Sequence, residues 1–143
     1  MNKVTIMRGL PGSGKSLYVD RFRRRAVVCS ADDFWLDDDG VYVYDEYLAP
    51  KAHASCLLKF LKALKDNVEH VVVDNTNIHV HEYAPYSALA EAFGCELNIV
   101  TVKADLTVCI RRQTHGVPIS TMERMAEEFE ETLPRHKQFE TIG

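Results

Sequence analysis

Short runs of consecutive apolar residues alternate along the chain with longer segments whose apolar positions recur every three or four residues. The short runs predict buried strands, and the longer segments predict amphipathic helices. Strands without a polar face are typical of a parallel sheet with helices on both faces, so we expect a single α/β domain over residues 1–143. The expected strands cover residues 4–7, 26–30, 71–74 and 97–103, and the expected helices cover residues 16–25, 50–65, 82–93, 106–113 and 120–133.

Local signals refine several of these elements. Asp39 and Gly40, followed by an alternating valine and tyrosine run, predict a hairpin turn within residues 35–47. Asp105 is a candidate helix cap, and Ser120 with a glutamate three residues later predicts a capping box for the last helix. The helix over residues 50–65 is expected to bury a face that contains Ala54, Leu57, Leu58, Leu61 and Leu64.

Composition and charge narrow the class of protein. The chain has 143 residues, of which 46% are hydrophobic and 27% charged, a balance typical of a soluble domain. No apolar run approaches the roughly 20 residues of a membrane helix, and the first residues lead directly into a strand, so we expect a cytoplasmic protein without a membrane partner. The net charge of −4 disfavours strong non-specific nucleic-acid binding but leaves room for a local basic groove. The basic run at residues 21–25 is interpreted as a solvated helix end.

The cysteines and histidines offer little metal chemistry. No two cysteines have C-x-x-C spacing, which favours small core residues in a reducing compartment over disulfides or zinc ligands. His79 and His81 flank Val80 after an expected strand; a metal role stays open, but a polar loop is the better interpretation. The four cysteines are Cys29, Cys56, Cys95 and Cys109.

Residues 9–16 read Gly-Leu-Pro-Gly-Ser-Gly-Lys-Ser and fill every position of a phosphate-binding loop (P-loop). The loop joins an expected strand to an expected helix, so its backbone amides can turn toward an anion at a helix N-terminus. Lys15 can reach the β- and γ-phosphates of ATP, and Ser16 can hold Mg²⁺. The alternative is a glycine turn that binds nothing. The expected nucleotide contacts come from Gly9, Pro11, Gly12, Ser13, Gly14, Lys15, Ser16 and Leu17.

Acidic and amide side chains follow two further strands. Because ligands of a parallel sheet bind at the carboxyl ends of its strands, these side chains are candidates for chemistry at the P-loop. Asp32 and Asp33 come directly after the second strand, where a carboxylate can orient an attacking hydroxyl and take its proton; the alternative is a helix cap or a loop acid. Asp74 is placed to hold a Mg²⁺-bound water, and Thr76 and Asn77 to contact the acceptor; the alternative is an Asx turn.

Two arginines end the helix expected over residues 106–113, before a break at residues 114–118. Arginines on such a lid segment can close over a triphosphate and stabilise its developing charge, so Arg111 and Arg112 are candidate phosphate ligands, with His115 as a lesser candidate. The alternative is ordinary positive charge at a helix end. Aromatic residues gather after Asp32, where they form either a small core or a surface for stacking a nucleobase: Phe34, Trp35, Tyr42, Tyr44 and Tyr47.

Four blocks together carry a resemblance to a known family. They are the P-loop, Ser-Ala-Asp-Asp-Phe at residues 30–34, Asp-Asn-Thr-Asn at residues 74–77, and Arg-Arg-Gln-Thr-His-Gly-Val-Pro at residues 111–118. In this order they resemble P-loop kinases, in particular the 5′-kinase domain of phage-type polynucleotide kinases and the P-loop domain of NEDD4-binding protein 2 and its relatives. The resemblance spans nearly the whole chain.

By this resemblance, Asp32 corresponds to the general base of the family. Lys15 and Ser16 correspond to its phosphate and Mg²⁺ ligands, and Arg112 looks like the first lid arginine. The phage-type kinases carry an arginine three residues after the base that holds the 3′-phosphate of the acceptor, whereas this chain has Trp35 there. Where they have a second lid arginine, this chain offers Thr114 and His115.

The resemblance and the residues together predict a kinase that uses ATP and Mg²⁺. Asp32, Lys15 and Arg112 are its expected catalytic residues, and Asp33 and Trp35 are expected to contact the acceptor. The first expected acceptor is the 5′-hydroxyl of a polynucleotide. The alternatives are a hydroxymethylated DNA base, a nucleoside or a small metabolite, and, in another class, a nucleotide-dependent binding module without an acceptor. The sequence predicts no oligomeric state.

Overall fold

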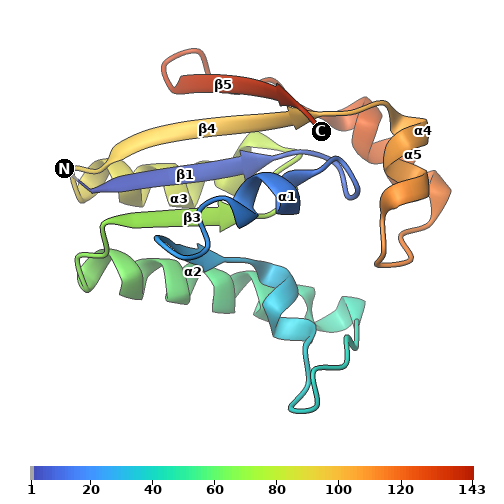
Figure 1. Ribbon diagram of the computed structural model, residues 1–143, viewed down its shortest axis with the longest axis horizontal. Helices are drawn as coiled ribbons and strands as arrows, with labels where there is room; N and C mark the ends of the chain where they lie inside the picture. Colours follow the sequence, from blue (N-terminus) through green and yellow to red (C-terminus); the bar gives the residue numbers. More distant parts are fainter. Residues whose placement is uncertain (1) are drawn as a thin grey trace.

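The computed structural model describes residues 2–143 and has a five-stranded parallel sheet at its centre. The strand order is β2-β3-β1-β4-β5, so β1 lies between β3 and β4 (Figure 1). In this register Met7 of β1 lies opposite Asp74 of β3, which brings the carboxyl ends of both strands to one edge. The predicted parallel α/β sheet is confirmed. The strands are β1 (Lys3–Arg8), β2 (Val27–Cys29), β3 (His70–Asp74), β4 (Glu96–Lys103) and β5 (Lys137–Ile142).

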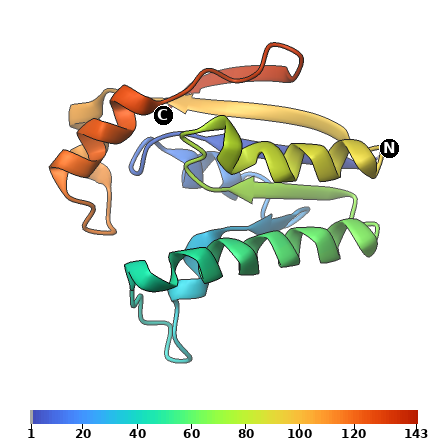
Figure 2. The ribbon, with the colours of Figure 1, turned by 180° about the vertical axis from the view of Figure 1, so that it is seen from behind.

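Helices cover both faces of the sheet, as predicted. Figure 2 shows α2 and α3 together on one face, and Figure 1 shows α1 on the opposite face. The last two helices lie beyond the carboxyl ends of the strands (Figure 1). The helices are α1 (Lys15–Asp20), α2 (Ala49–Lys65), α3 (Val80–Ala92), α4 (Leu106–Arg112) and α5 (Ile119–Glu128), with short 3₁₀ helices η1 (Ala31–Trp35) and η2 (Glu46–Leu48).

The core consists of one apolar layer on each face of the sheet. Val71 and Val73 of β3 pack toward α2 and α3, whereas Val72 packs toward Val19 of α1. This alternation is the period of two of a strand, and it explains why the strands have no polar face. Both faces of the central strands are therefore buried, and the sheet edge at their carboxyl ends is left for a site.

Several predicted boundaries are wrong for local reasons. The first helix ends at Asp20, and residues 21–25 continue as turns with exposed arginines. The last helix spans Ile119–Glu128 and begins after Pro118, so Ser120 lies inside the first turn and the predicted capping box does not form. Asp105 precedes α4, but its side chain makes no capping hydrogen bond within the described residues. β5 was missed because its positions are mostly exposed and polar, as on an edge strand.

The predicted buried face of α2 is correct at Leu64, which is buried, and wrong at Ala54 and Leu58. Leu58 is 67% exposed and Ala54 is exposed, whereas Phe60 is fully buried and packs edge-on against Tyr86 of α3 at 5.1 Å between ring centroids. The helix carries two overlapping apolar stripes, and tertiary packing selects the one with the largest aromatic side chain. The buried positions are Ala52, Cys56, Phe60, Ala63 and Leu64.

The cysteines behave as predicted. Three of them, Cys29, Cys56 and Cys109, are buried, Cys95 is half-buried, and all four are free thiols in the described part of the chain. Burial raises the pKa of the Cys29 thiol to about 12, so this thiol is protonated at neutral pH. Within residues 2–143, no helix combines the length and the apolar character that a membrane crossing requires.

The corrected face of α2 can be tested by stability. We expect Phe60→Ala to lower the free energy of unfolding by about 3–5 kcal/mol, because it leaves a cavity between α2 and α3. Leu58→Ala is the matched control on the same helix and should change it by less than about 0.5 kcal/mol. Urea unfolding followed by circular dichroism measures both. Equal losses for the two variants would contradict the observed orientation of the helix.

Candidate active site

The P-loop follows β1 directly and has a backbone that only glycine can adopt at two positions. Gly12 has a φ of 80°, and a Cβ atom there would lie 2.3 Å from the carbonyl oxygen of Cys109 in α4. Gly14 has a φ of 106° and is the N-cap of α1. Positive φ angles and close backbone approach both exclude a side chain. The two glycines therefore allow the loop to turn into α1 while it packs under the end of α4.

The end of β3 holds the P-loop in place. The Gly9 amide donates a hydrogen bond to the Thr76 carbonyl oxygen at 3.0 Å, and Asn77 Nδ2 donates to the Met7 carbonyl oxygen at 2.8 Å. Asn77 is 1% exposed and has a φ of 48°. Its predicted contact with the acceptor is wrong, because its amide is buried and already bound to β1. Thr76 contributes its backbone here, and an acceptor contact of its half-buried side chain stays a prediction.

Arg8, at the end of β1, is a fully buried cation that the sequence analysis missed. Its Nε donates to the Asn77 carbonyl oxygen at 2.8 Å, and its Nη2 donates to the carbonyl oxygens of Ile78 and Glu130. The guanidinium also lies over the rings of Tyr83 and Phe129. A buried arginine is tolerated because its donors are used. Arg8 thus joins β1, the loop before α3, and the segment after α5.

Lys15 is influenced by the charges of two carboxylates, those of Asp74 and Asp32. Its Nζ donates to the carbonyl oxygens of Gly9 and Leu10 at 2.9 and 3.0 Å. Burial lowers the pKa of Lys15, and the carboxylates of Asp74 and Asp32 oppose this shift. Burial raises the pKa of Asp74, and the charge of Lys15 opposes that shift in turn. The structure therefore brings together the predicted phosphate ligand, the predicted Mg²⁺ ligand and the predicted base.

The oxygen donors beside the P-loop fit a magnesium ion. Ser16 offers a hydroxyl from the exposed first turn of α1, and Asp74 offers a carboxylate at the end of β3. Mg²⁺ prefers oxygen ligands and keeps several of its waters, so few protein ligands suffice. Its charge would also relieve the cost of the partly buried Asp74 carboxylate. Both residues therefore remain the proposed metal ligands.

The position of Asp32 is fixed by hydrogen bonds of its own backbone amide and of the preceding one. The amide of Asp32 donates to Ser30 Oγ at 3.2 Å, and the amide of Ala31 donates to Asn75 Oδ1 at 2.9 Å. Asn75, which the sequence analysis did not single out, thus ties η1 to the end of β3. The Asp32 side chain is exposed, and so is that of Asp33, which lies 3.9 Å from Lys59 Nζ in an ion pair.

Trp35 is part of the core. It is 6% exposed and packs against Phe34 and Tyr44 with ring centroids at 5.1 and 4.9 Å. The prediction that Trp35 contacts the acceptor is wrong, because no base can reach a ring that is covered in this way. The other interpretation, an aromatic core of the insertion, is confirmed for this residue. Tyr44 and Tyr47 remain exposed on the same segment.

The lid segment lies against the P-loop and reaches Asp32. Leu10 of the P-loop packs with Cys109 and Met122, which anchors α4 and α5 to the loop. Burial raises the pKa of the Cys109 thiol, while the charges of Lys15 and Arg112 lower it, which places both cations beside this residue. Arg111, Arg112 and Leu17 are exposed, and their predicted contacts with ATP stay predictions.

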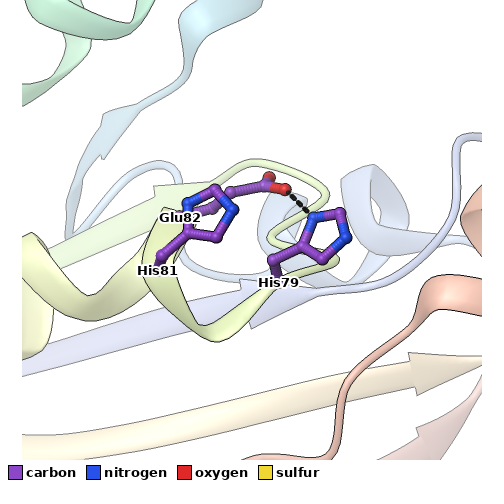
Figure 3. A group of neighbouring side chains, drawn as sticks. All are labelled: His79, His81 and Glu82. Atoms are coloured by element: carbon purple, nitrogen blue, oxygen red, sulfur yellow. Dashed lines mark hydrogen bonds and ion pairs between the residues drawn. The ribbon is translucent and has the colours of Figure 1, made fainter.

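His79, His81 and Glu82 lie together at the start of α3 (Figure 3). Their nearest ligand atoms lie within 4.8 Å of one another, but the two imidazole rings are parallel, with 12° between their planes. In-plane lone pairs of parallel rings do not converge on one ion. His79 Nδ1 instead pairs with Glu82 Oε1 at 2.7 Å, which raises the pKa of His79, and its Nε2 lies 3.5 Å from Glu128 Oε2 in α5. We assign this group a structural role.

Comparisons with known proteins agree with the fold. Residues 4–132 match the model of a family described as AAA domain. Human YLP motif-containing protein 1 is 28% identical over 93% of this chain, and human NEDD4-binding protein 2 is 27% identical over 89%. The chain spans only 7% and 8% of these relatives.

A chain in the structure of the Pnkp1/Rnl/Hen1 RNA repair complex superposes with a TM-score of 0.73 and 20% identity. The match covers 90% of this chain and 44% of that chain. At this identity the similarity shows the fold alone.

The tight approach of the P-loop to α4 gives a testable consequence. We expect Gly12→Ala to abolish binding of a fluorescent ATP analogue, because the new methyl group overlaps the Cys109 carbonyl and distorts the loop. Gly40→Ala is the matched control: Gly40 has a similar φ of 78°, but no atom lies within 4 Å of its would-be Cβ. Both variants should lose about 1 kcal/mol from backbone strain. Retention of nucleotide binding by Gly12→Ala would show that the loop does not cradle the nucleotide.

Proposed function

The chain belongs to the AAA domain family whose model it matches, and on this premise we propose that it is an ATP-dependent phosphotransferase acting on a hydroxyl group. The observation that carries the proposal is that Lys15, Asp32 and Asp74 come from segments that meet at one edge of the sheet. Hydrogen bonds from Gly9 to Thr76 and from Ala31 to Asn75 join these segments. A P-loop that only bound nucleotide would need the lysine. It would not need an exposed carboxylate in η1, which follows β2.

In the proposed mechanism, the loop amides and Lys15 bind the phosphates of ATP. Lys15 Nζ, which donates to the carbonyl oxygens of Gly9 and Leu10, turns from them to the β- and γ-phosphates. The negative phosphates restore the charged form that burial disfavours. Arg112 closes over the transferring group, and Arg111 assists it, because both end the helix that packs on Gly12.

The acceptor hydroxyl is activated by Asp32. The carboxylate takes the hydroxyl proton while the oxygen attacks the γ-phosphorus, and the bond to the β–γ bridging oxygen breaks to release ADP. The exposed position of Asp32 lets it return this proton to solvent after the transfer. Mg²⁺, held by Ser16 and through water by Asp74, would neutralise charge on the β- and γ-phosphate oxygens.

A polynucleotide 5′-hydroxyl is the first candidate acceptor. Its support is the set of sequence blocks shared with polynucleotide kinases and the fold shared with a chain of an RNA repair complex. Asp33 and Thr76 are the proposed acceptor contacts that remain beside Asp32. We also propose that the protein acts in the cytoplasm, which the four free thiols support.

The charge of the insertion favours a second candidate, an uncharged small acceptor such as a nucleoside or a metabolite. Residues 26–50 contain no lysine, arginine or histidine, and the acceptor side of Asp32 therefore repels a polyanion. Trp35 cannot replace an arginine that would hold a phosphate, because it is buried. The acidic residues of this segment are Asp32, Asp33, Asp37, Asp38, Asp39, Asp45 and Glu46.

The role of Asp32 is tested by Asp32→Asn. We expect this variant to bind ATP with unchanged affinity and to transfer the γ-phosphate about a hundredfold to ten-thousandfold more slowly, because the amide cannot take a proton. Transfer from γ-labelled ATP to 5′-hydroxyl oligonucleotides and nucleosides measures the rate. Asp66→Asn, at the C-cap of α2, is the control and should keep the wild-type activity. A near-normal rate in Asp32→Asn would refute the proposed base.

The choice between the two acceptor classes is tested by charge reversal. We expect Asp38→Lys together with Asp39→Lys to increase kcat/KM for a 5′-hydroxyl oligonucleotide severalfold at low salt, because two exposed charges of the insertion that follows Asp32 change sign. The value for a nucleoside should stay constant, and the gain should vanish at high salt. Equal effects on both acceptors would contradict an electrostatic selection at this segment.

A further inference from the structure

Asp32 is held between two loops that are far apart in the sequence. The Tyr42 hydroxyl donates to Asp32 Oδ1 at 3.4 Å, and His115 Nε2 lies 3.7 Å from Asp32 Oδ2. The rings of Tyr42 and His115 also pack against each other, with 4.6 Å between centroids. Tyr42 belongs to the insertion after β2, and His115 belongs to the lid after α4. The three side chains thus close the space between these two segments.

Each loop is braced independently. On the insertion side, Leu36 and Tyr42 form an antiparallel bridge, and the Val43 amide donates to the carbonyl oxygen of the buried Trp35 at 2.8 Å. The predicted turn forms, because the Gly40 amide donates to the Asp37 carbonyl oxygen at 2.9 Å, and a single bridge joins its two arms. The bridge and the Val43 hydrogen bond hold Tyr42 beside Trp35, which is part of the core.

On the lid side, the side chain of Gln113 closes the loop. Its Nε2 donates to the Val117 carbonyl oxygen and its Oε1 accepts from the Val117 amide, both at 3.0 Å. This pair of bonds leaves His115 at the tip of a defined turn in which Gly116 has a φ of 70°. The Gln113 amide also donates to the Cys109 carbonyl oxygen, which the P-loop residue Gly12 approaches. The position of His115 is therefore linked to that of the P-loop.

Resting on the proposed function, we propose that Tyr42 and His115 are positioning residues that orient the Asp32 carboxylate and couple the closed lid to the base. Tyr42 fixes Oδ1, so Oδ2 is the oxygen that takes the proton of the acceptor hydroxyl. His115 Nε2 lies beside Oδ2 and limits the directions from which the acceptor hydroxyl can approach that oxygen. Because His115 follows Arg112 by three residues, a lid that closes over ATP also brings His115 to Asp32.

The ionisation of Tyr42 is consistent with this role. Burial and the neighbouring Asp32 carboxylate raise the pKa of Tyr42 to about 12. The phenol is therefore protonated at neutral pH and can donate to the carboxylate throughout the working range. A hydroxyl that donates to a carboxylate stabilises its ionised form, which is the form that a general base needs.

The test compares Tyr42→Phe and His115→Ala with two controls, Tyr18→Phe in α1 and the exposed His53→Ala in α2. The probe is γ-labelled ATP with whichever 5′-hydroxyl oligonucleotide or nucleoside the wild type labels. We expect kcat to fall about tenfold to a hundredfold in the two test variants, with unchanged affinity for the ATP analogue. The controls should keep the wild-type rate. Fluorescence of Trp35, the single tryptophan, reports whether the insertion keeps its structure.

A double-mutant cycle separates a positioning role from a merely structural one. If Tyr42 acts through Asp32, then Tyr42→Phe should cost nothing further in an Asp32→Asn background. The same loss in both backgrounds, or a wild-type kcat in Tyr42→Phe and His115→Ala, would overturn the positioning role while Asp32 remained the base. If Asp32→Asn transfers phosphate at the wild-type rate, or the wild type labels no acceptor, the proposed function fails and the positioning role fails with it.

Discussion

The site depends on how the end of β3 is tied to its neighbours. The Thr76 carbonyl oxygen accepts a hydrogen bond from the Gly9 amide, and the Asn77 side chain donates one to Met7 of β1. Asn75 Oδ1 accepts a hydrogen bond from the amide of Ala31, the residue before the proposed base. The parallel register already aligns the ends of β1 and β3, and these bonds convert that alignment into fixed positions for the P-loop and η1. Asp74, the first residue of the same tetrapeptide, is thereby left to face Lys15. Four consecutive residues thus organise three segments of the site.

Electrostatics explain why this arrangement is suited to a nucleotide. A half-buried lysine and a half-buried carboxylate are each costly, and each shifts the pKa of the other toward the charged form. The carbonyl oxygens of Gly9 and Leu10 accept hydrogen bonds from Lys15 Nζ. Phosphate oxygens are stronger hydrogen-bond acceptors for Lys15 Nζ than these carbonyl oxygens, so the loop can bind a nucleotide without a change in its backbone conformation. The contact of His115 with Asp32 extends this preorganisation from the nucleotide site to the proposed site of the acceptor hydroxyl.

Sequence patterns predicted the features that depend on local chemistry. The P-loop, the parallel strands and the position of Asp32 follow from glycine spacing, apolar runs and the rule that ligands bind at strand ends. Features decided by tertiary packing were missed. Packing against the sheet and α3 determines which side of α2 is buried. Trp35 is buried in the core, and the Asn77 side chain is hydrogen-bonded to β1, so neither predicted acceptor contact is correct. Arg8 could have been suspected, because a cation that ends a buried strand requires partners.

The fate of the γ-phosphate tests the central claim most directly. The protein would be incubated with γ-labelled ATP, Mg²⁺ and separate pools of 5′-hydroxyl oligonucleotides, nucleosides and sugars, and the labelled products would be separated. The account predicts label in a phosphomonoester on one pool, formed by the wild type and not by a protein without the Asp32 carboxylate. Label released only as inorganic phosphate, at equal rates in both proteins, would contradict it.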